Sequence, residues 1–505
     1  GQANWEACGG MSAMEQLRDL CRPIWNLYSI RSLLYWDQQV IMPTRGGAAR
    51  AEQLASLEAV AHQLLTSPRL FDALCLAEEG EPQGIDAAYV RAVRRAYDLS
   101  AKLPAHLVEE KARVCSRAVE AWVEAKNADR FEDFLPHLRE VFRLSREVAE
   151  HRGYARHPYD AMLDEYEPGM TMAEVDRLFS ESLPFLVQLV ERIQAAPQVS
   201  RKILQQSFPI QAQHAFTRYL VHAIGFDFEA GRLDQSAHPF CSSSSAVDVR
   251  LTDRLDPRLV TMAIFGSLHE AGHGLYEQGS PPEWMGTPLA GGCSLGVHES
   301  QSRLWENFVG RGRPFWKAHF PVLREYFPEQ TWGYSSEDFY RAINLVEPSF
   351  IRVEADEVTY TLHIVMRFEL ERDMLDGTLD PADLPEAWNH KMQSRLGLRP
   401  PNNRLGCLQD IHWSDGLIGY FPTYSLGNLL AAQLWNKACQ QLPDLEAQIG
   451  RGECGTLLEW LRQHVHRKGS SVWPGELVQQ VCGEPLQVKP FLDYLGSKYT
   501  DLYSL

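Results

Sequence analysis

Hydrophobic residues recur at spacings of three and four over the first two hundred positions, a pattern typical of amphipathic helices. Three runs show this spacing: Leu17, Leu20, Ile24, Leu27 and Tyr28; Leu54, Leu57, Val60, Ala61 and Leu64; and Leu135, Leu138, Val141 and Phe142. Segments that contain proline and glycine, at residues 43–47, 80–82 and 167–169, separate such runs. The pattern predicts a stack of long antiparallel helices from Ala13 to about Ala195.

One short segment alternates with a period of two instead. In residues 246–252 (AVDVRLT) every second residue is apolar, which predicts a β-strand with one apolar and one polar face. We expect residues 289–296 (LAGGCSLG) to form its hairpin-like neighbour. A sheet this small can hold an extended peptide as an added strand, or it can be a purely structural ribbon. The pattern leaves both roles open.

Composition narrows the class of protein. The 505 residues are 45% hydrophobic and 23% charged, as in ordinary globular proteins. The net charge of −17 argues against nucleic-acid binding, because the surface repels phosphate and no run of Lys and Arg offsets it. No apolar run approaches the roughly 20 residues of a membrane span. We therefore expect neither nucleic acid nor membrane as a partner.

The start of the chain and its cysteines suggest where the protein works. The first residues, GQANWEACGGMSAMEQL, lack a basic segment followed by an apolar one and do not read as a secretory signal. We interpret residues 1–12 as a remnant or extension. The ten cysteines form no Cys-x-x-Cys pair, so neither a disulfide framework nor a structural zinc knuckle is expected. A cytoplasmic protein with free thiols fits best.

The candidate chemistry begins in residues 265–279, FGSLHEAGHGLYEQG. Asp256 followed by Pro257 predicts a helix start, and Gly279 predicts its end. On that helix His269 and His273 share a face and can bind one cation. Glu270 lies about 100° around the helix, beside the cation, where it can take a proton from a bound water.

A third ligand is available in residues 298–308, HESQSRLWENF, which predict a second amphipathic helix. Glu299 lies in its first turn. Two histidines and one carboxylate leave a fourth position for water, which is the catalytic arrangement of a zinc site. His298 is the alternative ligand, but it points about 100° away from Glu299. We therefore predict a metal site formed by His269, His273 and Glu299.

Six motifs in order resemble those of the thermostable zinc carboxypeptidases of the carboxypeptidase Taq family. They are HPF at 238–240, DVRLT at 248–252, HEAGH at 269–273, HESQ at 298–301, IRVEAD at 351–356 and GCLQDIHW at 406–413, and WDQQVIMP at 36–43 resembles the family's N-terminal segment. The resemblance spans nearly the whole chain and keeps every expected site position. It implies an active peptidase that removes single C-terminal residues with broad preference.

The resemblance also implies a fold and a cofactor. We expect an all-α fold with a very small β-sheet beside the active site and a deep groove, similar to neurolysin and angiotensin-converting enzyme. Residues 13–505 are expected to form one large domain, in which residues 13–200 make a helical lid and wall and residues 201–505 the catalytic part. Family members usually form homodimers and use zinc, and cobalt supports activity in some.

Several further residues receive roles from this likeness. Glu270 is expected to be the general base, and His412 and Tyr420 to donate hydrogen bonds to the oxyanion, with Tyr424 in reserve. The alternative for Tyr420 is simple packing against Pro422. Asp356 or Glu354 is expected to accept the second N–H of a metal-binding histidine.

An exopeptidase must also recognise the free carboxylate of its peptide substrate, and an arginine fork suits that task. Arg352 is the first candidate and Arg250 the second, while His238 could join the carboxylate site or line the terminal pocket. The structural alternative for Arg352 is a helical ion pair with Asp356. Two other functions stay open: a neurolysin-like metallo-endo-oligopeptidase without the carboxylate clamp, and a peptide- or metal-binding scaffold without turnover.

Overall fold

The computed structural model describes residues 11–505, so most of the predicted N-terminal remnant, residues 1–10, lies outside the described residues. The described chain consists of helices and one three-stranded sheet, which confirms the predicted all-α class with a very small β component. Among residues 11–505, no helix is both long enough and apolar enough to cross a bilayer.

The predicted helical segment is confirmed at both of its ends. The first helix begins at Ala13 because Ser12 caps it: the Ser12 hydroxyl accepts from the Glu15 backbone, and the Glu15 carboxylate accepts from the Ser12 backbone. The last of these helices ends at Ala195. The helices are α1 (Ala13–Val40), α2 (Gly47–Leu65), α3 (Pro68–Glu79), α4 (Gly84–Ala101), α5 (Ala105–Ala128), α6 (Phe131–Arg152), α7 (Pro158–Tyr166) and α8 (Met172–Ala195).

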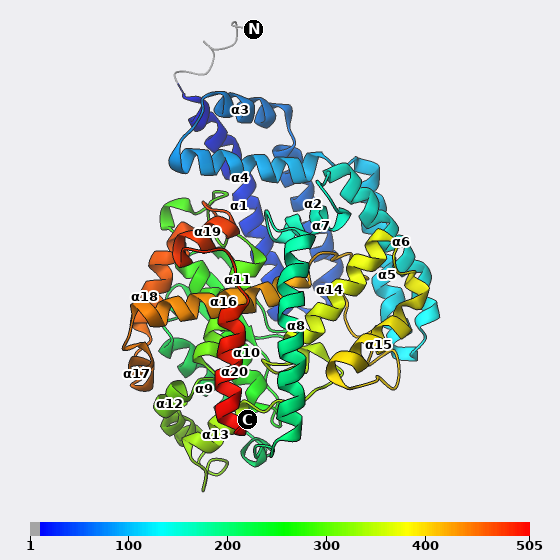
Figure 1. The fold of residues 1–505 in the computed structure, drawn as a ribbon. Helices are drawn as coiled ribbons and strands as arrows, with labels where there is room; N and C mark the ends of the chain where they lie inside the picture. Colours follow the sequence, from blue (N-terminus) through cyan, green and yellow to red (C-terminus); the bar gives the residue numbers. More distant parts are fainter. Residues whose placement is uncertain (1–10) are drawn as a thin grey trace, which may run out of the picture.

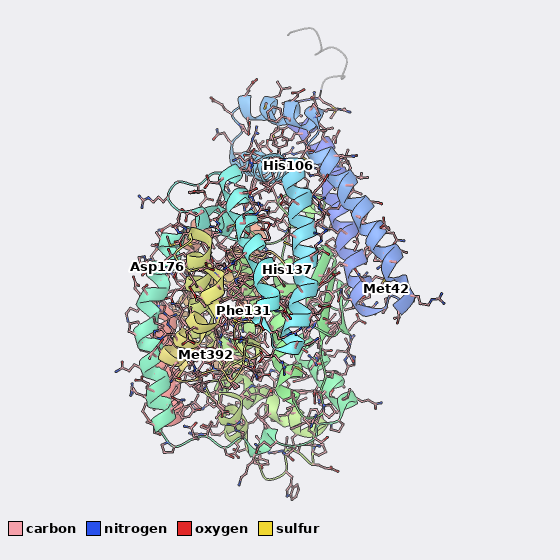
Figure 2. The ribbon with its side chains drawn as sticks, turned by 90° about the vertical axis from the view of Figure 1, so that its right-hand side faces the viewer. Met42, His106, Phe131, His137, Asp176 and Met392 are labelled. Carbon is pink, nitrogen blue, oxygen red and sulfur yellow. The ribbon has the colours of Figure 1, made fainter. Side chains whose placement is uncertain are left out.

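The N-terminal helices divide between two hydrophobic clusters. Residues of α1 to α4 form a cluster of their own, which Leu289 joins from a distant loop. The helices from α5 onward contribute to the large main cluster. Figure 1 shows α3 and α4 at the top of the molecule, while α1 runs from there down to the main body, where it contacts β2. In Figure 2, α5 and α6 run side by side, with His106 on α5 and His137 on α6. The proposed single domain with its lid and catalytic parts stays a prediction.

The second half of the chain forms the rest of the main body. Its helices are α9 (Ile210–Ala223), α10 (Val260–Gln278), α11 (Leu295–Arg303), α12 (Arg313–Tyr326), α13 (Ser336–Ile343), α14 (Tyr360–Asp376), α15 (Leu384–Leu396), α16 (Pro422–Gln441), α17 (Leu445–Gly450), α18 (Gly455–His464), α19 (Pro474–Cys482) and α20 (Lys489–Tyr503). The C-terminal α20 packs against α8 and α16, so both halves share one core (Figure 1).

The small sheet contains the predicted strand at its centre. Strand β3 (Asp248–Asp253) pairs in parallel with β1 (Gly231–Gln235) and antiparallel with β2 (Cys241–Ser245). The predicted alternation is confirmed for Val249 and Leu251, which are fully buried, but Val247 precedes the strand and is exposed, and Thr252 of the predicted polar face is buried. The expected neighbour at residues 289–296 is wrong. Residues 289–294 form an irregular loop and Leu295 begins α11, because β1 and β2 occupy both edges of β3 and Gly291 has a positive φ of 79°.

The helix that contains both histidines starts later than predicted. Helix α10 begins at Val260, because Asp256 and Pro257 form a turn in which the Asp256 carboxylate accepts from the Arg258 backbone. Its predicted end at Gly279 is confirmed. Helix α11 begins at Leu295, so Glu299 lies in its second turn instead of its first.

Two glycines let three helices approach closely at the site. A Cβ on Gly272 of α10 would lie 2.5 Å from the Gln301 carbonyl oxygen of α11, and one on Gly427 of α16 would lie 2.6 Å from the Glu299 Cβ. Both distances are far below van der Waals contact, so larger residues would force the helices apart. These glycines therefore allow α10 and α16 to press Glu299 toward the histidines.

Candidate active site

Three side chains from two helices converge at one point. The Nε2 atom of His269 lies 3.6 Å from the Oε2 atom of Glu299, and the Nε2 atom of His273 lies 3.4 Å from the same oxygen. The ligand atoms of the three residues all lie within 4.8 Å of one another. They are the only such group of potential metal ligands found within residues 11–505.

The spacing of these atoms fits a zinc ion. Zinc in proteins binds histidine nitrogen and carboxylate oxygen at about 2.0–2.2 Å in a tetrahedron, which separates neighbouring ligand atoms by about 3.4 Å. The two nitrogen–oxygen distances match that separation. The donor set and these two distances are therefore compatible with zinc.

A carboxylate fixes the ring of His269, but it is not one of those predicted. The Nδ1 atom of His269 lies 3.1 Å from Glu306, which belongs to a π-helical turn (Leu304–Val309) after α11. Asp356 instead accepts backbone N–H groups, including those of Val358 and Thr359, and Glu354 makes no hydrogen bond or ion pair with either histidine. The expected assignment of Asp356 or Glu354 is therefore replaced by Glu306. Its position seven residues after Glu299, two helical turns on the same face, was the signal in the sequence.

The other histidine is held by a chain of two side chains. The Nδ1 atom of His273 lies 2.7 Å from the Nδ1 atom of His298, whose Nε2 atom lies 2.6 Å from Glu277. If His298 donates from Nε2 to Glu277, its Nδ1 can accept the proton of His273 and leave Nε2 of His273 free for a metal. His298 thus lies behind a candidate ligand, whereas Glu299 is the third member of the converging group.

Glu299 itself is oriented by its own helix. Arg303 donates to its Oε1 atom at 2.7 Å, and the Ser302 hydroxyl donates to Oε2 at 3.0 Å. Burial alone would raise the pKa of Glu299, but His269 and Arg303 lower that pKa well below its usual value. The side chain therefore presents an ionised oxygen to the two imidazoles.

Burial and charge separate the proton affinities of the two histidines. Burial lowers the pKa of His269, but Glu299 and Glu306 outweigh it and raise that pKa to about 9. Burial lowers the pKa of His273 to about 4. A metal ion must displace the proton from His269, so we expect metal affinity to fall as the solution becomes acidic.

Glu270 lies beside the ligands and faces the same cavity. The cavity has a volume of about 450 Å³, and His269, Glu270, His273 and Glu299 all line it. Glu270 is only 8% exposed, and burial raises its pKa to about 7. A carboxyl group with such a pKa can both take and return a proton near neutral pH.

Two tyrosine side chains also form part of the cavity wall, and His412 lies behind Tyr424. Tyr420 and Tyr424 line the cavity, whereas His412 does not. The Nε2 atom of His412 lies 3.1 Å from the Tyr424 hydroxyl, and burial lowers the pKa of His412 to about 4. The structure thus brings Tyr420 and the reserve candidate Tyr424 to the site and gives His412 an indirect contact.

Arg352 is buried near this wall in a network of charges. Its guanidinium donates to Asp410 at 3.0 and 3.1 Å and to the Tyr360 hydroxyl at 3.1 Å, so the helical pair with Asp356 does not form. Arg367 donates to the same Asp410 at 2.6 Å. Two guanidinium groups share one carboxylate, which leaves a net positive charge. The Cζ atom of Arg352 lies 5.0 Å from the ring centre of Tyr424.

None of the three candidates for substrate binding lines the cavity: Arg352 lies behind Tyr424, and the other two lie elsewhere. Arg250 pairs with Asp248 at 2.8 Å and lies over the ring of Trp36, on the side of β3 that faces α1. His238 is exposed in the loop between β1 and β2. Its neighbours Pro239 and Phe240 line the cavity instead. Period-two alternation predicted a polar face for β3, but it could not show that α1 covers this face.

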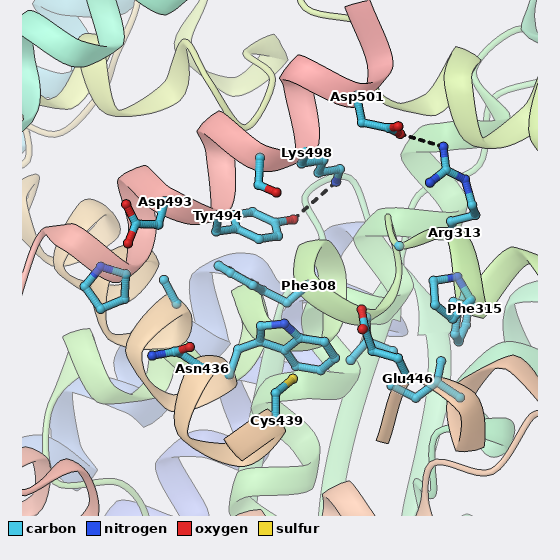
Figure 3. A pocket seen from close by; sticks show the side chains of 18 of the residues that line it. Phe308, Arg313, Phe315, Asn436, Cys439, Glu446, Asp493, Tyr494, Lys498 and Asp501 are labelled. Carbon is cyan, nitrogen blue, oxygen red and sulfur yellow. Dashed lines mark hydrogen bonds and ion pairs between the residues drawn. The ribbon is translucent and has the colours of Figure 1, made fainter. Parts of the chain in front are cut away.

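Two further cavities differ in their relation to the ligands. One of about 360 Å³ adjoins the cavity that the candidate ligands line, called here the metal cavity. Ser243, Glu277 and His298 line both cavities. A larger one of about 1270 Å³ lies among α12, α16 and α20, where Phe308 and Tyr494 stack with ring centres 4.1 Å apart (Figure 3). None of the predicted site residues lines the larger cavity. The converging ligands, and not cavity size, identify the candidate active site.

Comparison with known proteins gives one consistent result. Residues 16–499 match the family described as carboxypeptidase Taq (M32) metallopeptidase. Thermostable carboxypeptidase 1 of Thermus thermophilus is 44% identical over 97% of this chain and 99% of its own length. Carboxypeptidase 1 of Bacillus subtilis is 38% identical over 96% of this chain and 98% of its own length.

Solved structures agree with this similarity. The M32 carboxypeptidase of Deinococcus radiodurans R1 has a TM-score of 0.95 and 38% identity, with coverage of 98% of this chain and all of that chain. The carboxypeptidase of Pyrococcus furiosus has a TM-score of 0.94 and 37% identity, with coverage of 97% and 99%. Both the fold and the sequence are thus similar over nearly the full length.

Proposed function

Since this chain belongs to the carboxypeptidase Taq (M32) metallopeptidase family, we propose that it is a zinc-dependent carboxypeptidase that releases single residues from peptide C-termini with broad preference. The observation that carries this proposal is the convergence of His269, His273 and Glu299 beside Glu270 in one cavity. A zinc ion held by these three residues would supply Lewis acidity for water activation and carbonyl polarisation. Cobalt as an alternative metal stays a prediction.

Glu270 acts as the general base and then as the general acid. Its raised pKa, about 7, lets it accept a proton from the attacking water and return that proton to the leaving amine. Glu270 is not among the converging ligands, so its carboxylate oxygens stay free to accept a proton. The same carboxyl group therefore serves both halves of the reaction.

Tyr420 and Tyr424 stabilise the negative charge that develops on the carbonyl oxygen. Both line the same cavity as the ligands, and each has a hydroxyl that can donate a hydrogen bond. Burial raises the pKa of both hydroxyls, so they keep their protons at neutral pH. His412 acts through its contact with Tyr424.

The substrate lies along the edge of the small sheet. Strand β2 is an edge strand, and its residues Cys241 and Ser243 line the metal cavity. Ser243 also lines the adjoining cavity, as do Ser244 and Ser245. An extended peptide that pairs with β2 would place its upstream residues there and its C-terminus near the ligands.

The carboxypeptidase and the endopeptidase differ in one measurable property. We expect purified protein that contains zinc to release the terminal residue from a blocked dipeptide and from longer peptides, and to leave C-terminally amidated copies intact. Metal analysis and quantification of released amino acids test this in one experiment. Equal cleavage of amidated and free peptides would favour the endopeptidase, and absence of any cleavage would favour a binding scaffold.

Arg352→Ala is expected to weaken turnover of peptides with a free C-terminus by about 10²-fold or more, since loss of a charged hydrogen-bond partner costs about 2–5 kcal/mol. The physical reason is the net positive charge that Arg352 and Arg367 leave beside Tyr424 after they share Asp410. Arg250→Ala is the control, because Arg250 pairs with Asp248 away from the cavity. Comparable losses in the two variants would reject Arg352 as the carboxylate-binding residue.

The expected homodimer and the cytoplasmic location stay predictions that accompany this function. The nine described cysteines are all unpaired, as the prediction of free thiols requires. The biological peptide is defined here only by its free C-terminus.

A further inference from the structure

Glu371 is a buried carboxylate that the mechanism does not use. It lies on α14, is fully buried, and accepts three hydrogen bonds from neutral donors. The donors are the Tyr159 hydroxyl at 2.7 Å, the Trp413 indole N–H at 2.7 Å and the Gly419 backbone N–H at 2.6 Å. A buried carboxylate without compensation is costly, so a group with this many dedicated donors fixes its surroundings strongly.

Two of the donors flank the residues that form the cavity wall. Trp413 directly follows His412, which contacts Tyr424, and Gly419 directly precedes Tyr420. The segment between them has no helix or strand; turn hydrogen bonds from Gly416 and Leu417 hold its first half, and none of these local bonds reaches Gly419. One carboxylate therefore holds both ends of the irregular segment that presents His412 and Tyr420.

The third donor ties this segment to α7. Tyr159 is fully buried on α7, and a Cβ on Gly419 would lie only 2.7 Å from the Met162 carbonyl carbon on the same helix. Tyr166, at the end of α7, packs edge-on against Tyr420 with ring centres 5.2 Å apart. Glu371 thus bonds at once to the wall segment and to the helix that supports it.

We propose that Glu371 is a positioning residue for the proposed peptidase reaction, which holds Tyr420 and the His412–Tyr424 pair where the oxyanion forms. This inference rests on the proposed function, because the role of Glu371 is defined within that reaction. Glu371 itself contacts neither substrate nor metal. Misplacement of a reacting group by about 1 Å can cost about 10²-fold in rate. Loss of Glu371 is therefore expected to lower kcat, since the groups that it holds stabilise the transition state.

Glu371→Gln tests the proposal in the zinc-loaded full chain. The carboxamide has the same shape, but it has one oxygen instead of two. Trp413 and Gly419 donate to different oxygens of Glu371, so one of these two hydrogen bonds is lost and one end of the segment is released. We expect kcat to fall by about 10–100-fold, with KM and zinc content little changed. Glu369→Gln is the matched control: it lies two residues earlier on α14 and loses ion pairs with Lys391 and Arg395 instead. Its kcat is expected to stay at the wild-type value.

A double variant separates positioning from a general structural effect. In a Tyr420→Phe background the Glu371→Gln change should cost much less than in the wild type, because one group it positions is already lost. Equal losses in both backgrounds would overturn the proposal, and so would a wild-type kcat in folded Glu371→Gln. If Glu371→Gln does not fold, Trp413→Phe removes one donor and keeps an aromatic ring. An unchanged kcat in that variant would overturn the proposal as well.

Activity of the wild-type protein tests the proposed function, and the activity of Glu371→Gln relative to the wild type tests this inference. Release of terminal residues by the wild-type protein supports the function, whatever Glu371→Gln does. A wild-type protein that releases nothing removes the function, and with it the reaction that Glu371 is proposed to serve.

Discussion

Glu270→Gln is expected to reduce peptide hydrolysis by about 10²–10⁴-fold, the usual contribution of a general base, while zinc stays bound. Glutamine keeps the shape of the side chain but cannot take a proton from water. Glu270 lies in the cavity beside the ligands and is not one of the three converging groups. Zinc content by metal analysis and kcat on a blocked dipeptide measure the two effects separately.

Glu277→Gln gives a contrast for this result within the same cavity. Glu277 also lines the cavity, but it contacts His298, which in turn contacts the candidate ligand His273. Its loss should weaken zinc affinity by about 10–100-fold, as for other partners that orient metal ligands, and spare turnover at saturating zinc. Retained hydrolysis in Glu270→Gln would remove Glu270 from the mechanism.

Glu299→Gln is expected to lower zinc affinity by more than the roughly 10–100-fold that loss of an orienting partner costs, and to abolish turnover at ordinary zinc concentrations. The physical reason is that a neutral amide oxygen replaces the ionised oxygen that lies 3.4 and 3.6 Å from the two imidazole nitrogens. Calorimetric titration of the metal-free protein with zinc gives the affinity. Excess zinc should restore part of the activity.

His298→Asn decides between the two candidates for the third ligand. His298 contacts the Nδ1 atom of His273 from behind, so its loss should weaken zinc binding only moderately. A variant Glu299→Gln with full zinc affinity, next to a His298→Asn variant that binds none, would reverse the assignment of the third ligand.

Features that depend on neighbouring residues in the chain were predictable. A spacing of four places His269 and His273 on one face of any α-helix, wherever that helix lies in the fold. The alternation in residues 246–252 likewise predicts that Val249 and Leu251 face the core, although Thr252 of the predicted polar face is buried too. Helix boundaries were less accurate. At Asp256 a turn that the same side chain stabilises competes with the helix start, and α10 begins four residues later.

Features that depend on residues far apart in the sequence were not predictable in the same way. Asp356 was a plausible partner for a metal-binding histidine, but its carboxylate is used by nearby backbone N–H groups, and Glu306 takes the place instead. The position of the Arg352 guanidinium depends on its hydrogen bonds to Asp410, which lies 58 residues later in the chain. The expected strand neighbour at 289–296 failed because β1 and β2 already occupy both edges of β3.

The sequence by itself determined the helical class, the histidine pair and the family, because helix periodicity and ordered motifs are properties of the linear chain. Only the tertiary structure decided which groups surround the ligands. Close approach of α10, α11 and α16 at Gly272 and Gly427 brings Glu299 to the imidazoles, and burial then sets the proton affinity of Glu270. Distances between helices and the exclusion of water arise from packing of the whole chain, and no local pattern encodes them.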